Sequence, residues 1–233
     1  MQQLLLASTS TVYGKPYLGY LLPELAAFFK GVEEVVFIPY ARPSGLSYDA
    51  YTEVAKKAFN NIHIAIKGIH EFDSPQEAIM QAKGIFTGGG NSFVLLNELY
   101  QLDLLGVLKQ RISQGIPYFG TSAGSNIAGP TIMTTNDMPI VYPPAFQSLG
   151  LIPFNINPHY IDPDPDSTHM GETRETRIKE YLVFNEIPVI GLREGSWLSV
   201  KGTQITLKGK LHARWFQTAE KPLELVSGHL FNK

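Results

Sequence analysis

Residues 84–100 read GIFTGGGNSFVLLNELY and contain the clearest strand-to-helix unit of the sequence. The apolar run 84–87 leads into three glycines, a pattern that is typical of a buried strand ending in a tight turn. Apolar residues then recur with helical spacing over 93–100. A strand, a glycine turn and a helix in this order form the repeating unit of a parallel α/β sheet.

The same unit recurs before and after this stretch. Strands are predicted at 4–7, 35–38, 62–66, 84–87 and 117–119, and helices at 21–29, 51–59, from 74 onward, at 93–100 and at 104–112. This alternation predicts an α/β fold with a mostly parallel, doubly wound sheet and helices on both faces. Ligands bind such sheets outside the carboxyl ends of the strands, so the loops that follow the strands are the candidate sites.

The pattern changes after residue 130. Residues 130–166 are rich in proline, asparagine and aspartate and predict a long loop, whereas 171–184 predict a helix and 187–192 a further strand. Short antiparallel strands are expected near the C-terminus, at 197–200, 204–207 and 213–216. No linker, repeat or low-complexity tract interrupts the chain, so we expect one domain over residues 1–233.

Composition excludes several classes of protein. The 233 residues include 19 Lys and Arg against 21 Asp and Glu, and a net charge of −2 argues against a non-specific nucleic-acid binder. The absence of cysteine excludes disulfides, iron–sulfur clusters, thiolate zinc sites and a cysteine nucleophile. The first residues, MQQLLLA, lack the basic lead of a signal peptide, and no stretch reaches the roughly 20 apolar residues of a membrane span. We therefore expect a cytoplasmic protein without membrane contact.

Two glycine-rich turns follow predicted strands. Residues 120–124 read GTSAG and match G-x-S-x-G, in which the glycines allow a tight strand-to-helix turn that exposes Ser122 as a nucleophile. The backbone N–H groups of Gly89, Gly90 and Ala123 are candidates for an oxyanion hole beside that serine. A phosphate cradle at 88–90 is the alternative, although the lysine of the P-loop pattern is missing.

A serine nucleophile needs a base and an acid. Six histidines are available: His63, His70, His159, His169, His212 and His229. His159 is preferred because it lies in the long loop region, just after the apolar run 151–156. Asp137 and Glu194 could each orient its imidazole, and the sequence leaves both open. Asp162, Asp164 and Asp166 alternate with prolines, which predicts a rigid polar loop rather than a calcium site.

The motifs together resemble those of the peptidase E family, in their order and spacing. They are GGGN at 88–91, GTSAGS at 120–125, TNDMP at 135–139, NPHY at 157–160 and GETRE at 171–175. The resemblance implies a cytoplasmic serine exopeptidase that hydrolyses dipeptides with an N-terminal aspartate, on a fold related to class I glutamine amidotransferases. It implies Ser122 as nucleophile, His159 as base and Asp137 as the acid, with Glu194 as the rival acid. Such acyl transfer requires no metal and no organic cofactor.

Selectivity for an aspartyl side chain requires a local cation, because a net charge of −2 gives no general attraction for an anion. Arg174 is the preferred residue for binding the side-chain carboxylate of the substrate, and Arg177 shares its helix face. Arg42 and Arg193 follow strands and stay possible.

Two other functions remain open. A cyanophycinase-like hydrolase, or another serine exopeptidase or esterase, would share the serine machinery and differ in its pocket. A non-catalytic module would bind a phosphorylated ligand at the glycines 88–90. For the dipeptidase we expect a small peptide as the only partner, with the chain a monomer or a homodimer.

Overall fold

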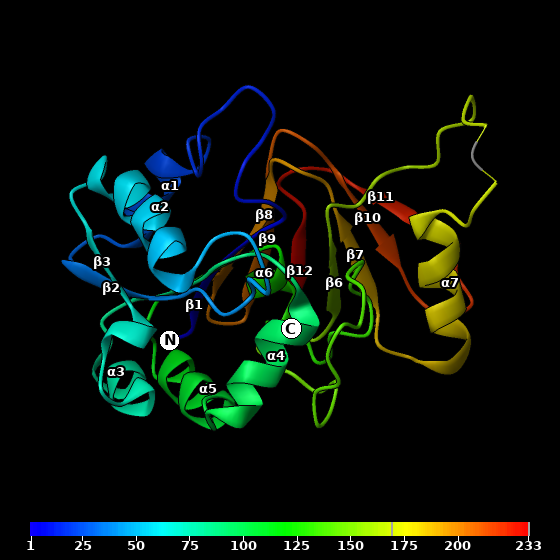
Figure 1. The fold of residues 1–233 in the computed structure, drawn as a ribbon. Coiled ribbons are helices and arrows are strands. Elements are labelled where there is room, and N and C mark those ends of the chain that lie inside the picture. The colour runs from blue at the N-terminus through cyan, green and yellow to red at the C-terminus, as the bar shows by residue number, and fades with distance from the viewer. Residues whose placement is uncertain (169, 233) are drawn as a thin grey trace.

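The computed structural model describes residues 1–168 and 170–232, so the candidate His169 lies outside the described residues. Five parallel strands form one side of an eight-stranded sheet, out to its edge at β3 (Figure 1). Their spatial order is β1 (Gln3–Ala7), β5 (Tyr118–Thr121), β4 (Ile85–Thr87), β2 (Glu34–Ile38) and β3 (Ala65–Gly68). Beyond β1 the sheet continues with the antiparallel strands β8 (Ser196–Lys201), β9 (Gln204–Gly209) and β12 (Leu230–Asn232).

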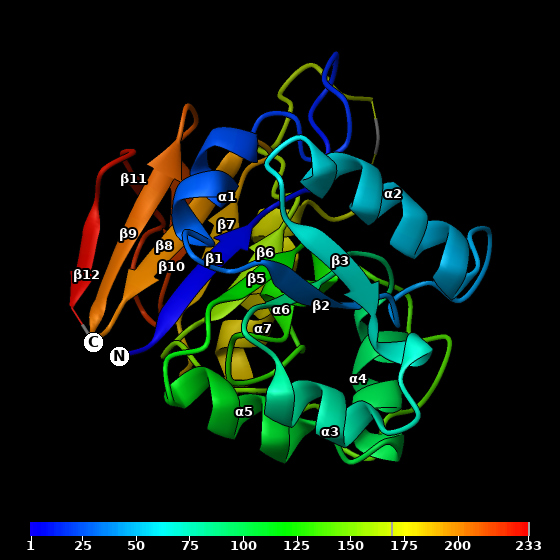
Figure 2. The ribbon, with the colours of Figure 1, turned by 90° about the vertical axis from the view of Figure 1, so that its left-hand side faces the viewer.

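Helices cover both faces of this sheet (Figure 2). One face carries α1 (Leu22–Phe28) and α2 (Tyr48–Asn60), and the other carries α3 (Pro75–Gln81), α4 (Ser92–Gln101) and α5 (Leu105–Ser113). The side chains of β1 alternate accordingly, because Leu5 packs into the core beneath α1 and α2 while Leu4 and Leu6 pack into the core of the other face. The predicted doubly wound α/β class is confirmed.

A second, four-stranded sheet carries the rest of the fold. Its order is β11 (Leu223–Leu225), β10 (Ala213–Phe216), β7 (Val189–Leu192) and β6 (Asn155–Pro158), and α7 (Arg174–Phe184) packs on it. Only β6 and β7 are parallel in this sheet. β6 lies inside the stretch 130–166 that was predicted as loop, so that prediction was incomplete, whereas the predicted short antiparallel strands near the C-terminus are confirmed.

The third strand was predicted two to three residues too early. β3 begins at Ala65, because α2 continues to Asn60 and the backbone N–H groups of Ile62 and Ile64 both donate to the Phe59 carbonyl at the helix end. β3 is followed by the 3₁₀ turn η1 (Ile69–Glu71). None of the helices in the described ranges is long and apolar enough to cross a membrane.

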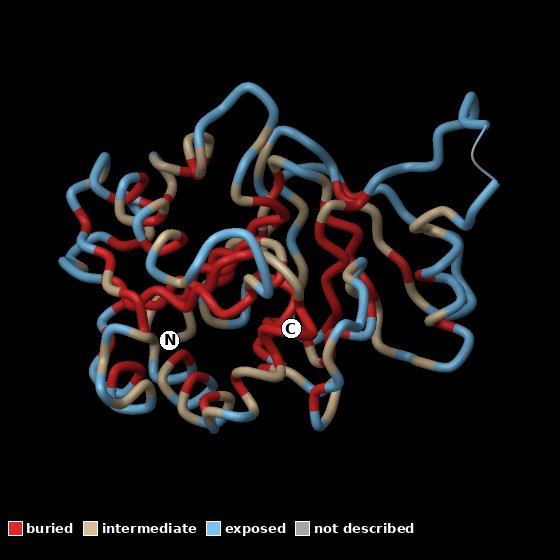
Figure 3. Tube along the Cα trace, in the orientation of Figure 1, coloured by how far each residue is buried: buried red, intermediate tan, exposed pale blue. Residues whose placement is uncertain are grey.

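Strand register brings the predicted loops to one edge. β1 pairs Ala7 with Thr121 of β5, and β6 pairs Pro158 with Leu192 of β7. Ser122 follows directly after the paired residue Thr121, and His159 directly after Pro158. Glu194 comes two residues after Leu192, the partner of Pro158. Figure 3 shows these strands buried in the middle of the molecule, while much of the chain that follows β6 is exposed.

Candidate active site

Ser122 occupies a strained turn between β5 and the short helix α6 (Ala123–Asn126). Its backbone has φ 52° and ψ −111°, a conformation that non-glycine residues rarely adopt. The flanking glycines are required sterically, because a side chain at Gly120 would collide with the Gly124 carbonyl and one at Gly124 with the Thr87 carbonyl. The predicted nucleophile turn is therefore present in the structure.

The His159 imidazole bridges a hydroxyl and a carboxylate. Its Nε2 lies 2.8 Å from Ser122 Oγ, and its Nδ1 lies 2.7 Å from Glu194 Oε1. If Nδ1 carries the proton and donates to Glu194, Nε2 is free to accept the serine proton. His159 itself has φ 54° immediately after β6, and its side chain is 33% exposed. The three groups have the geometry of a serine–histidine–acid relay.

Asp137 does not occupy the acid position, which corrects the expectation that it orients His159. Its Oδ2 accepts a hydrogen bond from the backbone N–H of Ser92 (2.7 Å) and one from the Thr135 hydroxyl (2.9 Å). Ser92 is the first residue of α4, and a carboxylate there satisfies a free N–H and the positive end of the helix dipole. Asp137 therefore stabilises the helix that follows the glycine turn 88–90, and Glu194 holds the imidazole.

The glycine turn lies against the nucleophile. A side chain at Gly89 would stand 3.0 Å from Ser122 Cβ. However, Gly89 N–H donates to the buried Tyr51 hydroxyl (2.9 Å), which corrects its expected role as an oxyanion donor. Gly90, at φ 146°, and Ala123 have backbone N–H groups without a hydrogen-bond partner in the described part of the chain. These two N–H groups are the ones available to an oxyanion.

The same hydrogen bonds argue against a phosphate cradle. Gly88 N–H donates to the Ile38 carbonyl (3.1 Å), and Gly89 N–H is held by Tyr51. Two of the three glycine donors therefore point into the protein, whereas a cradle needs several that converge on the ligand.

Arg174 lies close to the relay and carries an unsatisfied donor. Its side chain is half-buried at the start of α7, and its buried Nη1 has no hydrogen-bond partner among the described residues. Burial lowers its pKa, and so does the neighbouring charge of Arg177, while Glu194 and Asp137 raise it. Burial outweighs the two carboxylates, so the pKa of Arg174 lies below its ordinary value. With Arg177 it lines a small cavity of about 60 Å³ that also borders Asn157.

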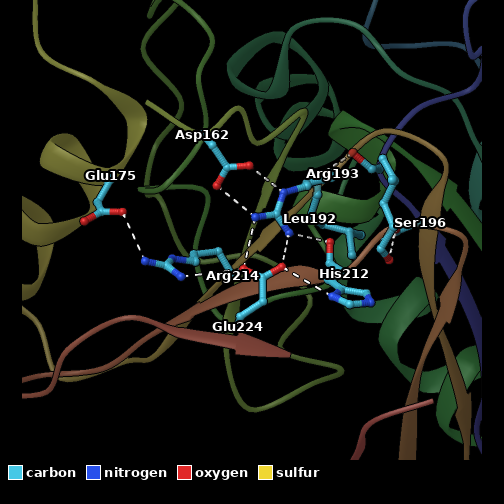
Figure 4. A network of polar contacts seen from close by, with 10 residues as sticks. Asp162, Glu175, Leu192, Arg193, Ser196, His212, Arg214 and Glu224 are labelled. Atoms are coloured by element: carbon cyan, nitrogen blue, oxygen red, sulfur yellow. Dashed lines mark hydrogen bonds and ion pairs between the residues drawn. The ribbon is translucent and has the colours of Figure 1, made fainter. Parts of the chain in front are cut away.

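Arg193 is fully used in holding the structure together (Figure 4). Its side chain forms bidentate pairs with Asp162 and Glu224 and donates to the His212 carbonyl, at 2.6 to 3.1 Å. All five N–H donors of the guanidinium are occupied, so Arg193 is not available to a substrate carboxylate. Its bonds instead connect the segment after His159 to β11. Because Arg193 directly precedes Glu194, the same bonds also hold the backbone next to Glu194 in place.

Arg42 remains near the glycine turn. Its guanidinium carbon lies 4.6 Å from the centre of the Tyr51 ring, and its Nε is buried without a hydrogen-bond partner in the described ranges. Sequence reasoning missed Tyr51, because the buried face of an amphipathic helix offers no signal that one of its residues also binds a loop. It also missed Ser8, although this residue follows directly after the first predicted strand.

The sequence and the fold were compared with known proteins. The model of Peptidase family S51 matches residues 4–208. "Peptidase E" of Streptomyces coelicolor is 47% identical over 225 residues, covering 97% of this chain and 91% of that protein. "Probable alpha-aspartyl dipeptidase" of Drosophila melanogaster is 42% identical over 219 residues, covering 93% of this chain and 90% of that protein.

Solved structures support the fold. The crystal structure of a peptidase from an acI-B1 Actinobacterium superposes with a TM-score of 0.73 at 15% identity, covering 100% of this chain and 97% of that one. A putative peptidase E from Listeria monocytogenes superposes with a TM-score of 0.68 at 22% identity, covering 90% of this chain and 99% of the other. The resemblance predicted from the motifs is confirmed: the chain belongs to peptidase family S51.

Proposed function

We propose that this serine-type peptidase is a dipeptidase that hydrolyses Asp-X dipeptides through Ser122, His159 and Glu194. The observation that carries the proposal is the continuous hydrogen-bonded path from Ser122 Oγ through the imidazole to the Glu194 carboxylate. The strained turn at Ser122 supports it, as do the N–H groups of Gly90 and Ala123, which have no partner within residues 1–168 and 170–232. Relatives named peptidase E and probable alpha-aspartyl dipeptidase support the substrate class.

The reaction is an acyl transfer in two halves. His159 Nε2 takes the Ser122 proton while Oγ forms a bond to the scissile carbonyl carbon, and the oxyanion binds to the N–H groups of Gly90 and Ala123. The imidazolium then protonates the leaving amine, the C–N bond breaks, and the X residue departs. A water molecule attacks the acyl-enzyme by the same proton path and releases aspartate. Throughout, Glu194 holds the Nδ1–H tautomer and stabilises the imidazolium.

We assign recognition of the substrate aspartate to Arg174, with Arg177 beside it. The desolvated guanidinium of Arg174 has a donor without a partner among the residues that the structure describes, and a substrate carboxylate would satisfy that donor with a charge-assisted hydrogen bond. An asparagine side chain offers no compensating charge. This arrangement supports selectivity for Asp-X over Asn-X.

The remaining partner assignments follow the same proposal. A small peptide is the only partner it needs, and a net charge of −2 supports neither a nucleic-acid nor an anionic-membrane role. A chain without cysteine gains nothing from an oxidising compartment, which supports a cytoplasmic location. A monomer or homodimer would suffice, because every group named above comes from one chain.

The test is a substrate panel of Asp-X, Glu-X, Asn-X and β-Asp-X dipeptides, assayed with the wild-type protein and with Ser122→Ala as the blank. The proposal expects hydrolysis of Asp-X well above that of the other three classes. Preference for β-Asp-X would favour a cyanophycinase-like hydrolase. No hydrolysis at all, together with stabilisation by inorganic phosphate in thermal unfolding, would favour the binding module.

A further inference from the structure

The Ser8 hydroxyl, at the end of β1, connects the two segments that carry His159 and Glu194. Ser8 is completely buried. Its Oγ accepts a hydrogen bond from His159 N–H (2.9 Å) and donates to the Leu192 carbonyl (2.6 Å). These directions are fixed, because a backbone N–H can only donate and a carbonyl can only accept.

Each end of this bridge acts on one member of the relay. His159 has a left-handed backbone (φ 54°), which its own side chain does not favour, and the Ser8 acceptor fixes the direction of its N–H. Leu192 ends β7, two residues before Glu194, and its carbonyl also accepts Tyr160 N–H (3.1 Å). The bridge therefore sets the spacing between the base and its acid partner.

The same strand end also holds the nucleophile. The carbonyl of Ala7, the residue before Ser8, accepts hydrogen bonds from Ser122 N–H (3.1 Å) and from the Ser125 hydroxyl (2.7 Å). Ser122 follows a strand of the eight-stranded sheet, whereas His159 and Glu194 follow strands of the four-stranded sheet. The two residues at the end of β1 thus provide a common reference point for groups that come from two different sheets.

We propose that Ser8 is a positioning residue for the catalytic relay: its hydroxyl holds His159 and the Glu194 segment in register with Ser122. The proposal rests on the serine mechanism proposed above. Because Ser8 is fully buried, removing its hydroxyl takes away the acceptor of His159 N–H and leaves that donor unsatisfied. Misplacement of reacting groups by about 1 Å can lower the rate by about 100-fold.

The test compares Ser8→Ala with Ser8→Thr, which keeps the hydroxyl, and with the matched control Ser148→Ala. Ser148 also donates to a backbone carbonyl, that of Gly129 (2.7 Å), which is not a member of the relay. Active sites are counted with a fluorophosphonate that labels Ser122, and kcat is expressed per labelled site. Ser8→Ala is expected to lower kcat per site by about 10- to 100-fold with KM within about twofold, while Ser148→Ala and Ser8→Thr stay close to wild type.

A structural role alone would give a different result. Destabilisation lowers the number of sites that can be labelled but leaves kcat per site unchanged, and that result for Ser8→Ala would overturn the proposal. An equal loss in Ser8→Thr would also overturn it, because the hydroxyl would then not be the cause. If Ser8→Ala does not fold, Ser8→Cys, with its weak hydrogen bonds, takes its place with the same expectation and the same refutation.

The labelling rate separates this proposal from the proposed function. If the wild-type protein labels at Ser122 but does not hydrolyse Asp-X, the substrate assignment fails. Ser8 is then judged on the labelling rate itself, which should fall about 10- to 100-fold in Ser8→Ala and not in Ser148→Ala. An unchanged labelling rate would overturn the positioning role.

Discussion

Glu194→Gln should impair catalysis far more than Asp137→Asn. The carboxylate of Glu194 lies 2.7 Å from His159 Nδ1, and its side chain is 52% exposed. Two unit charges about 4 Å apart interact by about 1 kcal/mol in water and about 4 kcal/mol near a protein surface. A half-exposed pair falls between these limits, so loss of the charge alone should cost about 5- to 1,000-fold in rate.

The amide adds a second cost. A glutamine at position 194 can donate its own N–H to Nδ1, and the imidazole would then carry its proton on Nε2, where it cannot accept the serine proton. We therefore expect kcat to fall by about 10²- to 10⁴-fold in Glu194→Gln. Asp137→Asn keeps an acceptor for Ser92 N–H and loses only its charge at the start of α4.

For Asp137→Asn we expect a fall in kcat of less than about tenfold and a fall in Tm of about 2–4 °C, the effect of losing about 1 kcal/mol at a helix N-terminus. Steady-state kinetics on an Asp-X dipeptide and thermal unfolding of both variants provide the measurements. The opposite ranking, with Asp137→Asn the more damaging to kcat, would refute Glu194 as the acid.

Other substitutions test the remaining parts of the site. Ser122→Ala should lose on the order of 10⁴-fold or more in kcat with an unchanged fold by circular dichroism, and near-normal turnover would exclude the serine mechanism. Arg174→Met should raise KM for Asp-X by about 10- to 150-fold, the value of a charge-assisted hydrogen bond of about 1.5–3 kcal/mol, and leave Asn-X nearly unchanged; equal losses on both would show a structural role. Tyr51→Phe removes the acceptor that holds Gly89 N–H, and with it a bond that fixes the glycine turn beside Ser122, so kcat should fall about fivefold to tenfold. The control Tyr100→Phe loses an exposed hydrogen bond to the Gln147 carbonyl and should leave kcat unchanged. Arg193 lowers the pKa of Asp162 in the folded state, so the stability that this carboxylate contributes is present at neutral pH and is lost as the pH falls below its ordinary value of 3.8. The Tm of Asp162→Asn should accordingly lie about 2–4 °C below that of the wild type at pH 7 and converge with it in acid, and a constant difference would contradict this.

Local patterns were sufficient to predict the parallel half of the fold. The run 84–100 contains a strand, a glycine turn and a helix in adjacent positions. The spacing of its apolar residues indicates the strand and the helix, and the three glycines indicate the turn. The second sheet was harder to predict, because β6 is only four residues long and lies between loops rich in proline and asparagine. Its identity as a strand depends on pairing with β7, more than 30 residues away, which no local pattern reveals.

The residues of the site likewise divide into those with a local sequence signal and those placed by long-range pairing. Ser122 was predictable because a tight turn needs glycines at fixed spacing, and His159 because it follows an apolar run. The choice between Asp137 and Glu194 was not, because it depends on which carboxylate the fold brings to Nδ1. Asp137 lies between Ser122 and His159 in the sequence, but the N–H of Ser92 binds it. Glu194 is 35 residues beyond His159 and is brought to it by the parallel pairing of β6 with β7.

The most direct test of the central claim is the position at which a fluorophosphonate modifies the protein, mapped by mass spectrometry of its peptides. The account predicts a single adduct on Ser122, formed more slowly in the presence of an Asp-X dipeptide and absent from Ser122→Ala. It also predicts that His159→Ala labels slowly, because Ser122 Oγ then has no base 2.8 Å away to take its proton. An adduct on another residue, or full hydrolysis of Asp-X by protein that carries the adduct on Ser122, would contradict the account.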